Sequence, residues 1–336
     1  MPVERVLLAQ PRGFCAGVEM AIKALAWMVD VFDAPVYCYH EIVHNRVVVD
    51  RFRALGVIFV DDVSEVPEGA PLMLSAHGTA PEVVAAARAN GGTVVDAVCP
   101  LVTKVHHEVR VRASKGLTVI YVGHAGHDEA VGTMAVAPGA VILVQSEAEL
   151  DALDLPADTP VALLAQTTLA MQDWAGILDK AKARFTNLWM PGRSDLCFAT
   201  TNRQTALRAI ADRADAVVVI GSENSSNTVA LVATARSAGC ARVLRVNSVD
   251  EIPDDLAGVV GVTAGASAPE DLVQAVVDRL APQQGVELVQ VTIEDEYFPP
   301  PRELRKVLAE HGRDGGLAND RTLTASQVLA TITPRS

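Results

Sequence analysis

The sequence predicts an α/β fold in which parallel sheets are covered by helices. Apolar runs rich in β-branched residues recur along nearly the whole chain, and helical patterns separate them. Short, continuously apolar strands of this kind are typical of parallel sheets with crossover helices on both faces. Half of the 336 residues are hydrophobic, which is enough for a sizeable buried core. The strand-like runs include Val3–Ala9, Val36–Tyr39, Leu72–Ser75, Thr118–Val122, Val161–Ala165, Ala216–Ile220 and Val259–Thr263.

Charge and hydropathy exclude several classes of partner. The formal net charge is −13, so the chain has no overall attraction for nucleic acid or anionic lipid. Apolar runs such as Ala216–Ile220 are far shorter than the ~20 residues that a membrane span needs. Met1–Arg5 carries charge and leads into no signal-peptide pattern. We therefore expect a cytoplasmic protein with no nucleic-acid or membrane partner.

Cysteine usage points to a metal or to catalysis. Five cysteines are an odd number in a long chain without an export signal, so a disulfide framework is not expected. None of them forms a CxxC pair, and this spacing excludes ordinary zinc fingers and ferredoxin-type runs.

Three of the cysteines begin similar stretches of sequence. Cys15, Cys99 and Cys197 each stand directly before a predicted helix. A polar turn follows each cysteine after about 28 residues, and a second polar turn follows after about 62 to 70 residues. The first turns lie in HEIVHNRVV, YVGHAGHDEA and IGSENSSNTV, and the second lie in LMLSAHGTAPE, ALLAQTTLAMQ and GVTAGASAPED. Self-similarity at a fixed period indicates a repeated structural unit.

The repeat predicts three βαβαβα units related by a pseudo-threefold axis. We place them at residues 1–97, 98–194 and 195–285, with a C-terminal strand and tail at 286–336. In open parallel sheets, ligands bind beyond the carboxyl ends of the strands, where helix N-termini offer free N–H groups. We therefore expect the three equivalent cysteines to meet near the axis.

Three converging thiolates suit two kinds of metal centre. One is zinc with an open fourth position, and the other is an iron–sulfur cluster with one iron left free. A first shell of sulfur alone, beside His, Ser, Thr and Asn, favours the cluster. Cys38 lies inside a strand-like run and Cys240 in a helix-end turn, and both are expected to pack as small apolar residues.

The polar turns collect neutral or switchable hydrogen-bond donors, which suit an anionic phosphate group. No GxxxxGK run and no DxD pair occurs, so magnesium-dependent phosphoryl transfer is not indicated. Glu129 either caps its helix or serves as a proton donor whose pKa is raised in a secluded site. The donors are His44, His77, His127, Thr167, Thr168, Ser225, Asn227 and Ser267.

Several motifs resemble the 4-hydroxy-3-methylbut-2-enyl diphosphate reductases, which complete the non-mevalonate isoprenoid route. They are PRGFCAGV, HEIVHNR, SAHG, DAVCPLVTKVH, GHAGHDEAVGTM, QTTL, CFATTNRQ, GSENSSN and VTAGASAP, between about Leu7 and Arg305. The resemblance implies three α/β units around a central 4Fe–4S cluster, one per chain, held by Cys15, Cys99 and Cys197.

The resemblance also implies the reaction and the remaining site residues. The reaction is the reductive dehydroxylation of (E)-4-hydroxy-3-methylbut-2-enyl diphosphate to isopentenyl and dimethylallyl diphosphate, with two electrons and two protons. Glu129 matches the proton-relay acid, and Thr168 and Asn227, with Thr167 alongside, match the residues that position the substrate hydroxyl and an ordered water. The diphosphate pocket matches His44, His77, His127, Ser225, Ser226, Asn227 and Ser267.

Electrons are expected to come from a partner protein, because no flavin or nicotinamide motif is evident. A ferredoxin or flavodoxin is the expected donor, and such carriers are typically acidic. A body of net charge −13 repels an acidic carrier unless it has a local basic patch. The candidate is the PRELRK segment, with Arg302, Arg305 and Lys306.

The chain departs from the family pattern in three places. Asp128 stands where the family often has proline, and Thr228–Leu231 reads TVAL where the family commonly has Ser-x-Arg-Leu. The tail His311–Ser336 lies outside the resemblance, has no strong period, and is expected to be partly disordered. Two alternatives remain open from the sequence: a three-cysteine cluster enzyme of the quinolinate synthase type, and a non-enzymatic iron–sulfur redox sensor.

Overall fold

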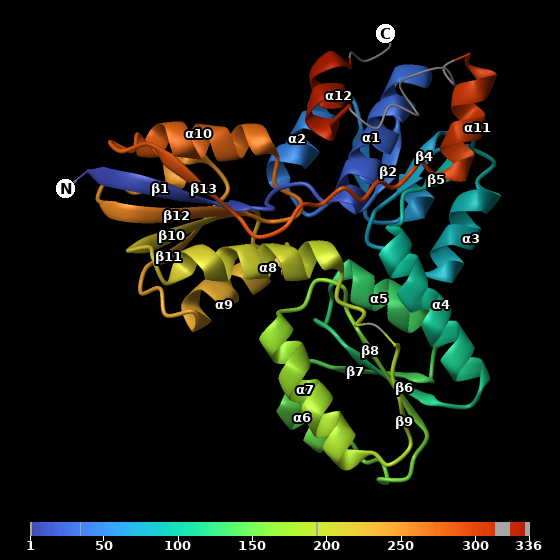
Figure 1. Cartoon of the computed structure of the whole chain (residues 1–336). Coiled ribbons are helices and arrows are strands. Elements are labelled where there is room, and N and C mark those ends of the chain that lie inside the picture. The colour runs from blue at the N-terminus through green and yellow to red at the C-terminus, as the bar shows by residue number, and fades with distance from the viewer. Residues whose placement is uncertain (1, 34, 193, 313–322, 333–336) are drawn as a thin grey trace.

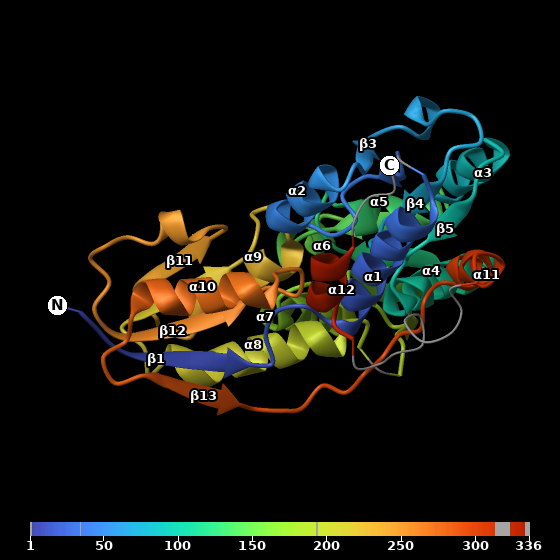
Figure 2. The same cartoon turned by 90° about the horizontal axis from the view of Figure 1, so that it is seen from above.

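The computed structural model describes residues 2–33, 35–192, 194–312 and 323–332. Within these residues the strands form three separate parallel sheets, and helices cover them (Figure 1). The prediction of an α/β fold with parallel sheets is confirmed. The three sheets and their helices lie around a common centre in Figure 1, and the view from above in Figure 2 shows β12, β1 and β13 side by side.

The first sheet has the strand order β3-β2-β4-β5, and all of its pairs are parallel. Its helix α1 is buried on nearly all sides, and its apolar residues form the centre of the largest hydrophobic core. The strands are β2 (Tyr37–Tyr39), β3 (Ile58–Val60), β4 (Leu72–Leu74) and β5 (Val94–Asp96). The helices are α1 (Ala16–Val31), α2 (Arg46–Ala54), η1 (Val63–Glu65) and α3 (Pro81–Ala89).

The second sheet repeats this order as β7-β6-β8-β9. Its central strands β6 and β8 are continuously apolar and almost wholly buried, as expected for a sheet covered on both faces. The strands are β6 (Thr118–Val122), β7 (Val141–Val144), β8 (Val161–Ala165) and β9 (Leu188–Trp189). The helices are α4 (Pro100–Ser114), α5 (Asp128–Ala135), α6 (Glu147–Asp151) and α7 (Met171–Arg184).

The third sheet has five strands in the order β11-β10-β12-β1-β13 within the described part of the chain. Helix α10 lies on one face, and α8 and α9 lie on the other (Figure 1). The strands are β1 (Val3–Gln10), β10 (Ala216–Ile220), β11 (Val243–Val246), β12 (Gly258–Ala264) and β13 (Val286–Gln290). The helices are α8 (Phe198–Ala211), α9 (Ser226–Ser237), η2 (Val249–Glu251) and α10 (Glu270–Leu280).

The N-terminal strand joins the last unit of the chain. Strand β1 pairs with β12 and β13, although the sequence placed it within 1–97. Its apolar side chains Val6, Leu7 and Ala9 are buried on both faces, so the strand needs a position between two others. Strands β5 and β9 are likewise the last strands before Cys99 and Cys197, and each closes the sheet of the unit that precedes that cysteine. The three units are thus joined in a ring, and the unit boundaries at 97 and 194 remain our proposal.

Two C-terminal helices pack against α1. They are α11 (Arg302–Glu310) and α12 (Ala325–Thr331), and Thr324 caps α12 with a capping box that includes Gln327. Ala325 and Val328 are buried in the same core as α1. The tail His311–Ser336, expected to be partly disordered, thus includes the packed helix α12, and its residues 313–322 and 333–336 lie outside the described residues. None of the described helices combines the length and apolar character that a membrane crossing requires.

Candidate active site

The three predicted cysteines occupy equivalent positions, each as the N-cap of a helix. Cys15 caps α1, Cys99 caps α4 and Cys197 caps α8. The positive end of a helix dipole lowers the free energy of a thiolate placed there. Each cysteine N–H donates to a carbonyl in the second polar turn of the preceding unit. The pairs are Cys15 with Ala266 (3.2 Å), Cys99 with Ala76 (3.0 Å) and Cys197 with Thr167 (3.0 Å).

The thiols share one small space. A Cβ placed on Gly17 would lie 2.8 Å from the Cys99 sulfur and 4.0 Å from the Cys15 sulfur, so only glycine leaves this space open. Burial raises the pKa of Cys197 to about 12, and the nearby Cys15 thiol adds to this rise. Burial also raises the pKa of Cys99, with further contributions from Cys15 and Cys197. Three thiolates here therefore require a positive group between them.

The other two cysteines lie elsewhere. Cys38 in β2 and Cys240 after α9 are buried in separate hydrophobic cores, as the sequence predicted. Burial raises the pKa of the Cys38 thiol, which keeps it protonated.

All the site residues predicted from the sequence line one cavity with the three cysteines. Side chains from all three units contribute to it, together with Phe298 from the C-terminal segment. The predicted residues in its wall are His44, His77, His127, Glu129, Thr167, Thr168, Ser225, Ser226, Asn227 and Ser267. Their individual roles stay predictions.

Three histidines form one wall of the cavity. The rings of His44 and His77 are stacked with centroids 3.8 Å apart, and His127 meets His44 edge-on at 4.9 Å. Burial lowers the pKa of His127 to about 4, with the nearby His44 adding to the effect. Burial, with His44 and His127 alongside, holds the pKa of His77 well below its usual value. In the absence of an anion these two imidazoles are therefore neutral.

The first polar turns also begin helices at equivalent places. Asn45 caps α2, His127 caps α5 and Ser225 caps α9 through their side chains. The distance from the Glu129 N–H to His127 Nδ1 is 3.1 Å. Free N–H groups at several helix N-termini favour a negatively charged ligand.

Asp128 lies among the histidines, a contact that the sequence did not predict. Its Oδ1 accepts a hydrogen bond from His40 Nδ1 at 2.9 Å. Burial by itself raises the pKa of Asp128, but the hydrogen bond from His40 and the charges of His40, His44 and His127 outweigh it and lower the pKa. His40 thus binds a partner that lies 88 residues away in the sequence.

Glu129 is buried with its carboxylate held at both oxygens. Thr167 donates its N–H to Oε1 at 2.8 Å and its hydroxyl to Oε2 at 2.9 Å. Burial raises the pKa of Glu129 to about 7, and the charge of Asp195 raises it further while the Thr167 hydrogen bonds oppose the rise. Tyr121 in β6 is fully buried close to this carboxyl. The sequence did not indicate it as a site residue, because a tyrosine inside an apolar strand is expected to be part of the hydrophobic core. Glu129 can thus carry a proton near neutral pH.

Hydrogen bonds within the third unit and between units fix the remaining donors. The Ala266 N–H donates to Asn227 Oδ1 at 2.9 Å, so the Asn227 amide nitrogen faces Thr200. The Ser267 hydroxyl donates to the His44 carbonyl at 2.9 Å. These contacts set the orientation of the side chains before any ligand binds.

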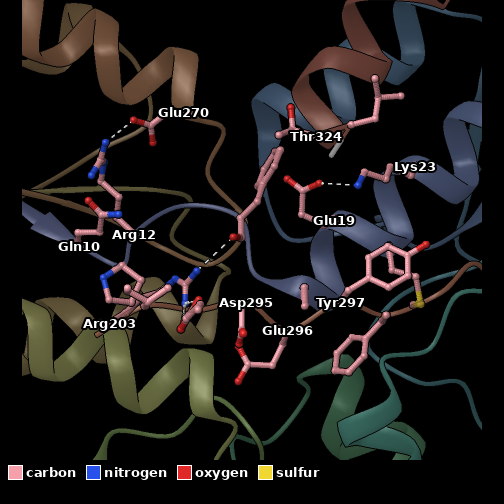
Figure 3. Close-up of a pocket in the computed structure, with 18 of the residues that line it drawn as sticks. Gln10, Arg12, Glu19, Lys23, Arg203, Glu270, Asp295, Glu296, Tyr297 and Thr324 are labelled. Atoms are coloured by element: carbon pink, nitrogen blue, oxygen red, sulfur yellow. Dashed lines mark hydrogen bonds and ion pairs between the residues drawn. The ribbon is translucent and has the colours of Figure 1, made fainter. Parts of the chain in front are cut away.

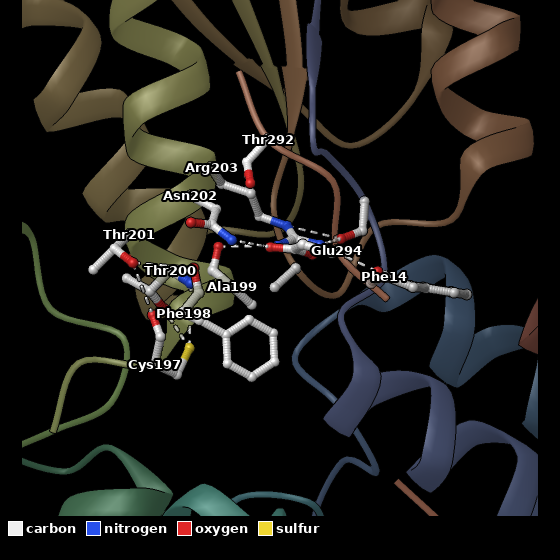
Figure 4. A network of polar contacts seen from close by, with 12 residues as sticks. Phe14, Cys197, Phe198, Ala199, Thr200, Thr201, Asn202, Arg203, Thr292 and Glu294 are labelled. Atoms are coloured by element: carbon white, nitrogen blue, oxygen red, sulfur yellow. Dashed lines mark hydrogen bonds and ion pairs between the residues drawn. The ribbon is translucent and has the colours of Figure 1, made fainter. Parts of the chain in front are cut away.

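A buried arginine, whose role the sequence did not predict, connects three segments of the chain through polar contacts (Figure 4). Arg203 in α8 has no exposed surface and donates to the carbonyls of Gly13 (2.8 Å) and Phe14 (3.2 Å), just before Cys15. It also forms a 3.0 Å ion pair with Glu294 in the C-terminal segment. Because Phe298 of that segment lines the cavity, Arg203 connects two parts of its wall.

A second cavity of about 590 Å³ lies beside the same loop (Figure 3). Its basic side chains are already paired with acids, as in the 3.2 Å pair of Lys23 with Glu19 and the contact of Arg12 with Glu270. This cavity offers no unpaired cation within the described residues, and the chemistry-bearing groups lie in the first cavity.

Comparisons with known proteins agree with one another over most of the chain. The family model of the LytB protein matches residues 6–281. The 4-hydroxy-3-methylbut-2-enyl diphosphate reductase of Rhodopirellula baltica is 46% identical over 313 residues, covering 91% of this chain and 97% of that protein. The enzyme of the same name from Burkholderia pseudomallei is 45% identical over 309 residues, covering 91% and 99%.

A solved structure has the same fold. The E-1-hydroxy-2-methyl-but-2-enyl-4-diphosphate reductase from Plasmodium falciparum superposes with a TM-score of 0.89 at 32% identity, covering 93% of this chain and 100% of that chain.

Proposed function

Because the chain belongs to the LytB protein family, we propose that it is a 4-hydroxy-3-methylbut-2-enyl diphosphate reductase. It converts (E)-4-hydroxy-3-methylbut-2-enyl diphosphate to isopentenyl and dimethylallyl diphosphate. The observation that carries this conclusion is one cavity that holds three thiols, a protonatable carboxyl and a set of anion-binding donors. The relatives are reductases by name, so the quinolinate synthase and redox-sensor alternatives are set aside.

We infer that Cys15, Cys99 and Cys197 hold one 4Fe–4S cluster. Support comes from the sulfur-only donor set, from the three helix N-termini behind it, and from the open space that Gly17 leaves between two of the sulfurs. When bound, such a cluster supplies electrons and an iron without a protein ligand, where the allylic hydroxyl can bind.

The diphosphate is proposed to bind among the histidines and the Ser225–Asn227 turn. His77 and His127 are neutral in the free protein, so their rings can take up protons or share N–H groups as the anion enters. The helix N-termini at Asn45 and Ser225 add uncharged N–H donors. Asn227 and Thr168 would then orient the substrate hydroxyl.

Glu129 is proposed to transfer the protons of the reaction. Breaking the C–O bond with two electrons releases the hydroxyl, which needs one proton to leave as water. A second proton ends on a carbon of the allyl fragment, and the choice of carbon gives one or the other product. A buried carboxyl whose pKa lies near 7 is protonated often enough at neutral pH to serve as this acid.

Electron delivery by a ferredoxin or flavodoxin stays a proposal, as does the cytoplasmic location. Arg302, Arg305 and Lys306 are exposed on α11, and they form no ion pair with the described residues. Helix α11 begins four residues after Phe298, which lines the cavity. An acidic carrier bound to α11 would therefore dock beside the segment that carries Phe298.

The proposed function is tested by turnover under strict exclusion of oxygen. The protein is reconstituted with iron and sulfide, supplied with a chemical one-electron reductant, and given the allylic diphosphate. We expect both isomeric products by mass spectrometry and NMR, with none from the protein without iron. A preparation with four irons per chain that leaves the substrate unchanged would refute the proposal.

A further inference from the structure

Asp195 is a buried acid to which the proposed mechanism gives no part. It lies between β9 and α8, two residues before Cys197, and its side chain has no exposed surface. Its Oδ2 accepts the Ala165 N–H at 3.3 Å, and its Oδ1 accepts a hydrogen bond from Lys104 Nζ at 3.3 Å. A buried charge is unfavourable unless it is paired and hydrogen-bonded, and both oxygens of Asp195 have such partners.

The contact with Ala165 is one of two that fasten the loop before α8 to the end of β8. The other is the 3.0 Å hydrogen bond from the Cys197 N–H to the Thr167 carbonyl. Thr167 also donates its N–H and its hydroxyl to the Glu129 carboxyl. Thr167 therefore connects a proposed cluster ligand with the proposed acid, and Asp195 holds the backbone that carries Thr167.

Lys104 is the counter-ion of Asp195 within the described part of the chain. It lies on α4, whose N-cap is Cys99, and its side chain is 42% exposed. Burial raises the pKa of Asp195, and the charge and hydrogen bond of Lys104 oppose this rise. Glu108 on the same helix also faces Asp195, but it is paired with Arg112 at 2.9 Å. The ion pair thus favours a charged Asp195 and connects it to the helix of the second cysteine.

Asp195 also acts on Glu129 through its charge. Burial raises the pKa of Glu129 to about 7, the hydrogen bonds from Thr167 oppose this rise, and the charge of Asp195 adds to it. Tyr121 faces the same carboxyl from β6, and burial raises the pKa of its hydroxyl well above the usual value, so it is neutral. His127, on the helix of Glu129, is neutral because burial lowers its pKa to about 4. Among these described neighbours, Asp195 is the charged one.

We propose that Asp195 is a positioning residue for proton transfer by Glu129, with Lys104 as its counter-ion. The hydrogen bond that it accepts from Ala165 fixes the turn from which Thr167 holds the Glu129 carboxyl. Its negative charge favours the protonated form of that carboxyl, which is the form that can donate. The inference rests on the proposed function, in which Glu129 supplies the protons of the reaction.

The test measures the protonation of Glu129 in Asp195→Asn, reconstituted as the anaerobic holoenzyme. Asparagine fits the same space and keeps an oxygen for the Ala165 N–H, but it carries no charge. The pKa of Glu129 should therefore fall by about half a unit or more. It is read from the infrared band of the protonated carboxyl, which is identified by its loss in Glu129→Gln. The fall in kcat with rising pH should move to lower pH by the same amount, with little change in KM.

The matched control is Asp215→Asn, which removes an exposed carboxylate that accepts the Val259 N–H at 2.8 Å. This control should leave the pKa of Glu129 unchanged. The double variant Asp195→Asn with Lys104→Met places no ammonium group beside the new amide, and the pKa should fall there too. An unchanged pKa in either Asp195→Asn protein, or an equal fall in the control, would overturn the inference. The infrared measurement needs no turnover, so a failed reductase assay beside a shifted pKa would refute the proposed function alone.

Thermal unfolding tests the role of Lys104 as the counter-ion. Lys104→Met leaves the buried Asp195 charge without its partner and should lower the unfolding temperature of the holoenzyme. The double variant with Asp195→Asn should recover part of this loss, because neither charge then remains. An unfolding temperature equal to that of the wild type in Lys104→Met would overturn this role.

Discussion

At the scale of single residues, the pKa values of two adjacent carboxyl groups are shifted in opposite directions. Burial raises the pKa of Glu129 to about 7, whereas the hydrogen bond from His40 and the neighbouring imidazoles hold the pKa of Asp128 below its usual value. When the pKa values of two neighbouring carboxyl groups diverge in this way, one group can act as an acid while the other stays negatively charged. Sequence reasoning identified Glu129 from its turn, but it could not foresee the charge state of Asp128, because His40 lies in another unit.

Glu129→Gln should keep the cluster and substrate binding while losing proton transfer. The amide preserves the size of the side chain: its oxygen can accept the Thr167 N–H, and its NH2 group can donate to the Thr167 hydroxyl. We expect turnover to fall by roughly 10²–10⁴-fold, the usual loss for a general acid, with little change in KM. Single-turnover kinetics with iron content measured in parallel checks this. Near wild-type turnover would reduce Glu129 to a helix-start residue.

The pH dependence of turnover should follow the Glu129 proton. The acid works only when protonated, so the rate should fall as pH rises through about 7. Burial lowers the pKa of His127 to about 4, which takes that group out of this range. The measurement is kcat as a function of pH with a small artificial reductant. The driving force for electron transfer from this reductant is kept constant across the pH range. In Glu129→Gln the residual activity should not fall as pH rises through this range. If the variant showed the same fall in kcat as the wild type, a group other than Glu129 would be responsible.

At the scale of secondary-structure elements, helix N-termini carry the chemistry. Three begin at cysteines and three begin at the first polar turns, so six helices direct free N–H groups toward one centre. These positions were predictable because the same local pattern recurs three times in the sequence. The helix α12 was not, since Ala325 and Val328 become buried only through packing against α1.

Helix α11 should bind the electron donor through its basic face. Reversing Arg302, Arg305 and Lys306 to glutamate should raise KM for an acidic protein donor by about tenfold or more at low salt. Leu304, Val307 and Leu308 stay in place as the buried face of the helix. Activity with a small artificial reductant should be unchanged.

The matched control for α11 reverses two exposed basic residues elsewhere, Lys115 and Arg236. This control should leave KM for the protein donor near its wild-type value. An unaltered KM in the α11 variant, or an equal rise in the control, would dismiss α11 as the docking element.

At the scale of the whole molecule, each unit is completed by a strand that stands before the next cysteine. Strand β1 closes the ring by entering the third sheet. The sequence predicted the units from their period, but it could not assign β1, because a buried apolar strand reads the same in either sheet. Arg203 was equally hidden, since its partners at Gly13 and Glu294 are 190 and 91 residues away.

Arg203→Met should destabilise the protein by removing a buried tie between units. Breaking a buried ion pair on one side costs about 3–5 kcal/mol, because the remaining charge loses its counter-ion. Glu294 would lose its ion pair with Arg203. We expect a lower thermal unfolding temperature, with part of the loss recovered in the double variant Arg203→Met with Glu294→Gln. An unchanged unfolding temperature in the single variant would show that the tie is not needed for stability.

The central claim, that three equivalent cysteines hold one cluster, is tested most directly by iron content per chain after anaerobic reconstitution. We predict about four irons in the wild type, and in Cys38→Ser and Cys240→Ser, whose sulfurs lie in hydrophobic cores. Cys15→Ser, Cys99→Ser and Cys197→Ser should each lose most of their iron. Full iron occupancy in any one of these three variants would contradict the account.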